Sequence, residues 1–142
     1  MRCLLASLVL LLLAACGTAS PPDRAAAVVT APTMAERVVG RWEMNRVLDR
    51  GADATAVHNP AGDRYVELRA DGTFESGGRP YGRHTGRWTL DPAYNELILE
   101  SDLGDADDSY WIVTLDGDEM EWAGVRSETA RRFRILSRRA TR

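Results

Sequence analysis

Apolar and polar side chains alternate with a period of two through most of this 142-residue chain, from Val38 onward. In residues 41–48, for example, the inward positions Trp42, Met44 and Leu48 alternate with Arg41, Glu43 and Asn45. Successive side chains of a strand point to opposite faces, so the pattern predicts strands with one buried and one wet face. The predicted strands are residues 40–48, 64–70, 73–76, 85–90, 95–100, 109–115, 119–124 and 131–137.

The connections between these eight strands are too short for parallel crossovers. We therefore expect an antiparallel meander. Eight strands suffice to close such a sheet into an up-and-down barrel, which removes both of its edges. A two-sheet sandwich is the alternative, but its Greek-key returns need longer connections. The predicted fold class is all-β, an eight-stranded antiparallel up-and-down barrel.

Long and tight connections alternate along the predicted meander. Alternate connections of a meander lie at opposite ends, so the long loops should form a mouth and the tight turns a closed base. The long connections are residues 49–62, 77–83, 101–109 and 124–130. The tight turns are residues 71–72, 91–94 and 116–118. The candidate mouth residues, which are polar or aromatic side chains of the long loops, are Asn59, Arg79, Tyr81, His84, Asp102, Asp105 and Arg126.

The inward-facing positions of the predicted barrel are large and apolar. An eight-stranded barrel is just wide enough for its own side chains or for one small ligand. The four tryptophans would fill much of that interior, yet their rings would also form a wall that an apolar ligand favours. The pattern thus leaves open both a filled barrel and a shallow binding site. The predicted interior residues are Met44, Leu68, Phe74, Trp88, Leu97, Leu99, Trp111, Trp122, Phe133 and Ile135.

The N-terminus has the pattern of an export signal. Arg2 precedes an apolar run that extends from Leu4 to Ala15. This run is too short to span a bilayer as a stable helix and is typical of a signal peptide. It ends in LAACG at residues 13–17, which resembles the lipobox of bacterial lipoproteins.

The lipobox resemblance implies removal of residues 1–15 and acylation of Cys16. It predicts a protein of the bacterial cell envelope that contacts the membrane through the lipid on Cys16. Gly17 beside the cysteine implies the outer membrane, with the protein facing the periplasm. The alternative is an ordinary signal peptide that leaves Cys16 as a free thiol.

Residues 16–36 are rich in Ala, Thr and Pro, so we interpret them as the lipidated cysteine and a flexible linker. Within them, Thr33 and Glu36 have the spacing of a capping box, which predicts one helical turn before the domain; a plain loop is the alternative. The folded domain is expected at residues 37–142. Neither of the two cysteines lies in it, so its stability must come from its core.

The segment VVGRWEMNRV at residues 38–47 resembles the Gly-x-Trp entry to the first strand of lipocalins. The runs DGTF, GRWTL and NELIL between residues 71 and 99 resemble the compact lipocalin-like domains of bacterial lipoproteins. The resemblance covers residues 38–139. It implies a lipocalin-like barrel that binds an apolar ligand, with the first tryptophan plugging the base under an arginine of the last strand.

Trp42 is the tryptophan that this resemblance assigns to the base. Arg139 shares the inward parity of Phe133 and Ile135, so Arg139, or its neighbour Arg138, is expected to stack on Trp42. Such a cation–π contact contributes about 1–2 kcal/mol when it is desolvated. The alternative is a solvated basic tail.

The tripeptide GRW occurs twice, and its second copy has a packing explanation. Gly86 leaves space for a crossing side chain or a bend in the barrel wall, and Trp88 fills the interior beside it. The surrounding residues show no further similarity, so the second copy is no evidence of an internal repeat.

Catalytic and metal-binding patterns are missing from the sequence. It contains no nucleophile elbow, phosphate loop or zinc-spaced cluster, so we expect no enzyme, no cofactor and no metal. The two histidines, His58 and His84, lie in or beside long loops and are expected to be solvated. The acidic run at residues 102–108 lacks the EF-hand spacing. A net charge of −3 gives no reason to expect nucleic acid.

Two functional hypotheses remain. The first is an envelope lipoprotein that binds a small apolar ligand at the barrel mouth. The second is a filled barrel whose mouth loops contact an envelope protein, as a non-enzymatic interaction module or a protease inhibitor. A cavity of a few hundred Å³ would favour the first, and a filled interior the second.

Overall fold

The structure is a computed structural model, and it describes residues 30–141. The predicted signal peptide at residues 1–15, Cys16 and most of the predicted linker lie outside the described residues. The described elements, in chain order, are α1 (Met34–Val38), β1 (Gly40–Asp49), β2 (Ala52–Asp53), α2 (Thr55–His58), β3 (Tyr65–Leu68), β4 (Thr73–Gly77), β5 (His84–Asp91), β6 (Glu96–Ser101), η1 (Asp105–Asp107), β7 (Ser109–Asp116), β8 (Glu119–Gly124), α3 (Glu128–Arg131) and β9 (Phe133–Arg139).

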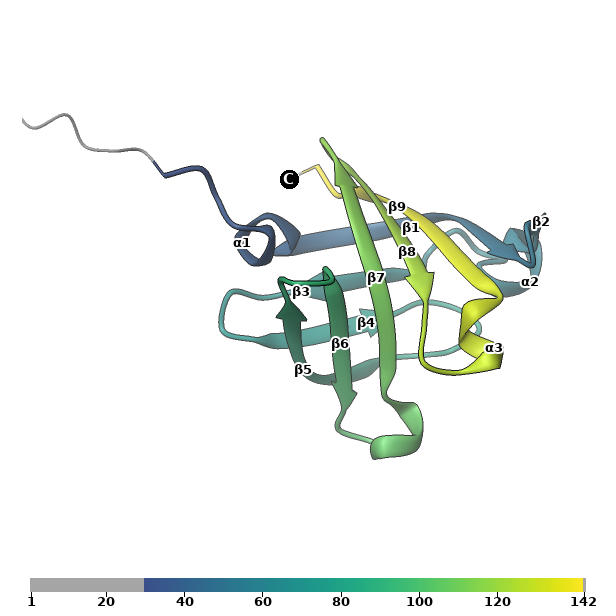
Figure 1. Ribbon diagram of the computed structural model, residues 1–142. Coiled ribbons are helices and arrows are strands. Elements are labelled where there is room, and N and C mark those ends of the chain that lie inside the picture. Colours follow the sequence, from purple (N-terminus) through teal and green to yellow (C-terminus); the bar gives the residue numbers. More distant parts are fainter. Residues whose placement is uncertain (1–29, 142) are drawn as a thin grey trace, which may run out of the picture. The chain divides into compact units, whose positions relative to one another are not determined.

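The strands form one antiparallel sheet that closes on itself (Figure 1). Strand β1 pairs with β3, each later strand pairs with the next, and β9 returns to pair with β1 from Trp42↔Arg139 to Asp49↔Phe133. The fold class is confirmed as an eight-stranded antiparallel barrel, and the two-sheet alternative is wrong. The two-residue strand β2 is an addition to this barrel, paired with the end of β1.

The two ends of the barrel differ as the loop lengths predict. The tight turns β3–β4, β5–β6 and β7–β8 lie at the base, together with the start of β1 and the end of β9. The long connections and the short helices α2, η1 and α3 lie at the mouth. The predicted capping box forms: the Thr33 side chain accepts a hydrogen bond from the Glu36 amide, and Glu36 accepts from the Thr33 amide. This capped turn, α1, precedes β1 at the base.

Strand β1 contains a β-bulge, so the predicted alternation of its side chains is wrong beyond Met44. Pairing with β9 shifts register between Met44 and Arg46, so one extra residue enters the strand. Side chains beyond the bulge therefore change face: Val47 is buried, whereas Leu48, which the period of two placed inward, is only half-buried. The Asn59 side chain holds the bulge, because its Nδ2 donates to the Met44 carbonyl at 2.6 Å.

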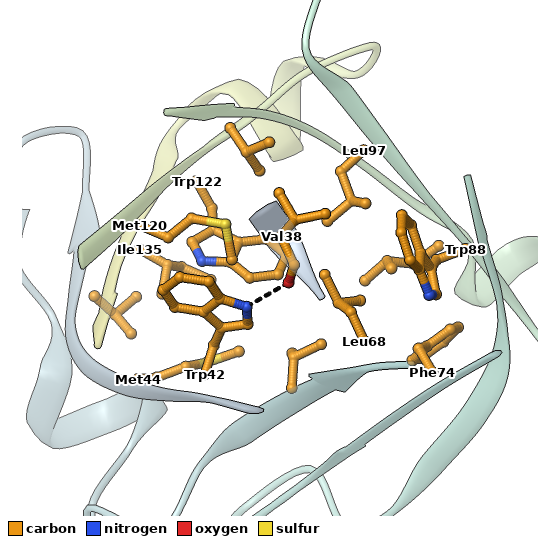
Figure 2. Packing of buried hydrophobic residues seen from close by; sticks show 14 residues of the cluster. Val38, Trp42, Met44, Leu68, Phe74, Trp88, Leu97, Met120, Trp122 and Ile135 are labelled. Atoms are coloured by element: carbon orange, nitrogen blue, oxygen red, sulfur yellow. Dashed lines mark hydrogen bonds between the residues drawn. The ribbon is translucent and has the colours of Figure 1, made fainter. Parts of the chain in front are cut away.

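The base half of the barrel is filled by side chains (Figure 2). Trp42 lies at its centre with no exposed surface, and its indole Nε1 donates to the carbonyl oxygen of Val38 at 2.8 Å. Trp122 is paired in the same way, since its Nε1 donates to the Ser137 hydroxyl at 2.8 Å. These bonds allow large rings to be buried without leaving an N–H unsatisfied. The fully buried side chains are Trp42, Trp122, Leu68, Leu97, Met120, Val38, Val47 and Val113.

The glycines of the two GRW tripeptides each lie where a Cβ would collide with a neighbouring residue. A Cβ on Gly40 would collide with the Arg139 guanidinium, and Gly40 also has φ +141°, which favours glycine. A Cβ on Gly86 would collide with the backbone carbonyl oxygen of Glu100 and would lie 2.7 Å from Cε1 of Phe74. The repeat therefore reflects two separate packing requirements.

Candidate functional site

The structure places Arg139 over Trp42 at the base. The guanidinium carbon lies 4.3 Å from the Trp42 ring centroid, and the two residues are paired directly across β1 and β9. Arg139 Nη1 also donates to the Val39 carbonyl at 2.7 Å. Arg138 points elsewhere and bonds Glu119 at 2.8 Å. The base is thus closed by a stacked ring and a hydrogen-bonded cation, so a ligand cannot enter there.

The mouth half of the barrel is hollow. One hollow has a volume of about 190 Å³ and is lined by inward-facing Phe74 and Leu99. A second, of about 150 Å³, is lined by Trp111, Phe133 and other inward-facing side chains of β1 and β9. Arg64 and Tyr81 line both hollows. The smaller hollow thus has mainly apolar walls, whereas in the larger one Phe74 and Leu99 lie among serines, His84 and Asp107. An arginine and a tyrosine lie at the point that the two hollows share.

Arg64 is a site residue that loop position alone did not predict. It precedes β3 and has the inward parity of Val66 and Leu68, so extending that alternation by one step would have found it. Its guanidinium carbon lies 4.5 Å from the Tyr81 ring centroid, and its Nη1 donates to the His58 carbonyl at 3.1 Å. Burial lowers the pKa of the Arg64 guanidinium from its ordinary value, because desolvation disfavours the charged form.

Three mouth segments that are distant in sequence meet around Arg64. His58 Nδ1 forms a hydrogen bond with the Tyr81 hydroxyl, and the two rings are stacked, with centroids 6.2 Å apart. His58 also packs edge-on against Phe133, at 5.2 Å between centroids. His84 Nε2 forms a hydrogen bond with the Tyr81 carbonyl at 3.0 Å. This bond joins the loop before β5 to the first residue of β5. His58 is thus half-buried and packed, which corrects its expected solvated state.

The other predicted mouth residues differ in what they present to a ligand. Asn59 is wrong as a mouth group: it is buried, and its side chain bonds Met44 and the Arg64 amide. Arg126 lies in the long connection after β8, where it donates to Glu96 at 2.6 and 2.8 Å. It lines a separate hollow of about 350 Å³ beside Tyr110 and Trp111.

The remaining predicted residues lie at the rim. Arg79 is exposed and pairs with Asp63 at 3.2 Å. Asp102 accepts from the Thr85 hydroxyl at 2.8 Å, and Asp105 is exposed in η1. None of these three lines either hollow.

Trp111 is the tryptophan that borders the mouth. It is half-buried and lines a hollow, and it packs edge-on against Trp122 with centroids 6.3 Å apart. Of the other predicted interior residues, Met44, Leu68, Phe74, Trp88, Leu97, Leu99, Trp122 and Ile135 are buried in the core, and Phe133 packs against it. The boundary between the filled and hollow halves therefore runs beside Trp111.

A larger hollow, the outer groove, lies outside the barrel. It has a volume of about 570 Å³ and is lined by outward-facing side chains of β7, β8 and β9, such as Thr114, Glu121 and Leu136. Arg46 and Asp53 on its rim already pair with each other at 3.0 Å. We place the candidate site at the mouth instead, because apolar rings and a shielded cation converge there.

Residues 30–141 contain no group of three His, Cys, Asp or Glu side chains that could hold a metal ion. Across the same described range, no helix has the length and apolar character needed to cross a bilayer.

Comparison with known proteins gives a likeness of fold. No family model and no curated protein matches the chain. Among solved structures, the chain is similar to the crystal structure of a DUF4847 family protein from Bacteroides vulgatus ATCC 8482, determined at 1.00 Å resolution. The match has a TM-score of 0.52 and 13% sequence identity, and it covers 73% of this chain and 94% of that chain. At this identity the likeness shows a related barrel fold alone.

Proposed function

We propose that this chain is a non-enzymatic, membrane-anchored lipoprotein of the bacterial envelope whose barrel binds a small apolar ligand at its mouth. The observation that carries the proposal is the hollow mouth half, walled by Phe74, Leu99 and Trp111 above a filled base. Apolar walls with a few convergent polar groups are typical of small-molecule sites.

The size of the hollows limits the ligand. Pockets for drug-sized ligands have volumes of about 300–1,000 Å³. The mouth hollows, at about 190 and 150 Å³, are smaller. Each buried methylene contributes about 0.8 kcal/mol, so a short chain gains a few kcal/mol in such a site. The proposal is therefore a short-chain ligand that is held weakly and exchanges readily.

The lipobox that ends at Cys16 supports the proposed lipid anchor. Gly17, the residue after the cysteine, supports the proposed location in the outer membrane. Because the chain enters the barrel at its base through α1, the mouth would face away from the membrane into the periplasm. Cells fed an alkyne fatty acid should label the wild-type protein, and the Cys16→Ser variant should carry no label. Equal labelling of both proteins would contradict acylation at this cysteine.

Ligand binding is tested by filling one hollow at a time. Ser76 lines the larger mouth hollow and Thr114 lines the outer groove, so Ser76→Phe and Thr114→Phe are matched variants. Calorimetric titration with octanol should give binding to the wild type and to Thr114→Phe, and none to Ser76→Phe. Absence of binding to the wild type, or loss only in Thr114→Phe, would overturn the proposal.

A second candidate function is contact with another envelope protein through the mouth loops. It is favoured by two large apolar side chains that stand out from these loops, Val57 at 68% and Leu103 at 65% exposure. Cross-linking in cells should then capture one defined protein, and the double variant Val57→Ser with Leu103→Ser should lose it. A wild type that captures no protein would remove this candidate.

A further inference from the structure

Arg64 is a shielded arginine that lacks a carboxylate partner in the described part of the chain. Three other arginines are similarly half-buried, namely Arg69, Arg132 and Arg139, and each of these pairs with a carboxylate. The remaining arginines of residues 30–141 are exposed to solvent. A buried charge without a counter-charge is costly, so this exception requires an explanation.

The contacts that hold Arg64 use only part of its bonding capacity. Tyr81 stacks on the planar face of the guanidinium, and the His58 carbonyl takes a bond from Nη1. A guanidinium has five N–H donors along its edge. Its Nε and Nη2 groups have no partner among the described residues, and Arg64 lines both hollows. Its free edge is therefore available to a ligand in the mouth.

The surroundings of Arg64 favour an anion. Asp107 is the one acidic residue that lines either mouth hollow, and it is exposed in η1 rather than paired with Arg64. Burial of the guanidinium, which also lowers its pKa, strengthens its attraction for an oxyanion because little water screens the contact. The ring of Phe74 lines the larger of these hollows and the ring of Trp111 lines the smaller.

We propose that Arg64 binds the oxyanion head of a short-chain amphiphile, such as a medium-chain carboxylate, whose apolar tail lies against Phe74, Leu99 and Trp111. This assignment rests on the proposed binding function and names its ligand class. Guanidinium and carboxylate are both planar, so the free edge of Arg64 can donate two parallel hydrogen bonds.

The test compares two probes with the same tail on the purified protein. Calorimetric titration with octanoate and octanol should show octanoate binding to the wild type about tenfold or more tightly, as expected for hydrogen bonds to a charged group. Arg64→Met should remove that preference while keeping octanol binding. The matched control is Arg87→Met, which removes an exposed arginine from the outer face of β5 and should keep the preference.

A second variant keeps the test independent of the stability of Arg64→Met. Asp107→Asn removes the one acidic group lining the hollows and should raise octanoate affinity severalfold with octanol unchanged. Equal affinity of the wild type for the two probes, or a preference that survives in Arg64→Met, would overturn the role of Arg64 while leaving the binding site in place. Failure of both probes to bind would instead overturn the proposed function.

Discussion

Removal of the Trp42 ring tests the physical basis of the barrel. Trp42 has no exposed surface, donates to the Val38 carbonyl and supports the Arg139 guanidinium. The Trp42→Ala variant therefore opens a cavity in the base and also leaves a buried carbonyl without its donor. Trp42→Phe is the informative intermediate, since it keeps most of the apolar ring and loses the indole N–H.

The magnitude follows from burial. A buried tryptophan removes about 200 Å² from water, which at about 25 cal/mol per Å² corresponds to roughly 5 kcal/mol. Measured large-to-alanine replacements of this kind cost about 3–5 kcal/mol. The unpaired Val38 carbonyl adds about 1 kcal/mol. For a domain of this size, 1 kcal/mol shifts the melting temperature by roughly 4 °C, so Trp42→Ala should lower it by about 20 °C.

Thermal unfolding followed by circular dichroism measures this difference. Trp42→Phe should lose about 1–2 kcal/mol, or a few degrees, because only the hydrogen bond and part of the ring are removed. Tyr94→Ala is the control, since Tyr94 is 71% exposed in the β5–β6 turn at the base. A Trp42→Ala melting temperature within about 2 °C of the wild type and of Tyr94→Ala would refute the reasoning.

Three further predictions concern the wall and its surface. Gly86→Ala should lower the free energy of unfolding by about 1–3 kcal/mol, measured by urea denaturation, because its Cβ would collide with the Glu100 backbone carbonyl and crowd Phe74. Ser137→Ala should lower it by about 1–3 kcal/mol in the same assay, because it leaves the buried Nε1 of Trp122 unpaired. The Arg83 guanidinium, with the Tyr65 hydroxyl, lowers the Glu75 pKa to about 2 from an ordinary 4.5. Stability from Glu75 should thus be complete above pH 4.5 and lost as the pH falls toward 2, and acid titration of Glu75→Gln should show a smaller loss.

Much of the barrel could be predicted because its cause is local. Alternation with a period of two determines which side chains face inward. In an antiparallel meander, the alternation of long and tight connections determines which end of the barrel is the mouth and which is the base. The β1 bulge could not be predicted in this way. It depends on Asn59, fifteen residues further along, whose side chain bonds the Met44 carbonyl and so stabilises the one-residue shift that brings Val47 inward.

The candidate site was harder to predict than the fold. Its polar centre combines His58 and Arg64 of the connection before β3 with Tyr81 of the connection before β5, and Tyr81 is 23 residues from His58. Loop position alone selected Arg126, whose side chain donates to Glu96 and lines a separate hollow, because sequence does not show which way a long side chain turns. The alternation of β3 was the usable signal for Arg64, because it extends to the residue just before the strand begins.

A crystal structure of the protein with octanoate tests the central claim most directly, namely a barrel filled at its base and open to a short amphiphile at its mouth. The account predicts electron density for the chain beside Phe74 and Trp111, with the carboxylate at the free edge of Arg64. A mouth closed by its own side chains, or octanoate bound only in the outer groove beside Thr114, would contradict it.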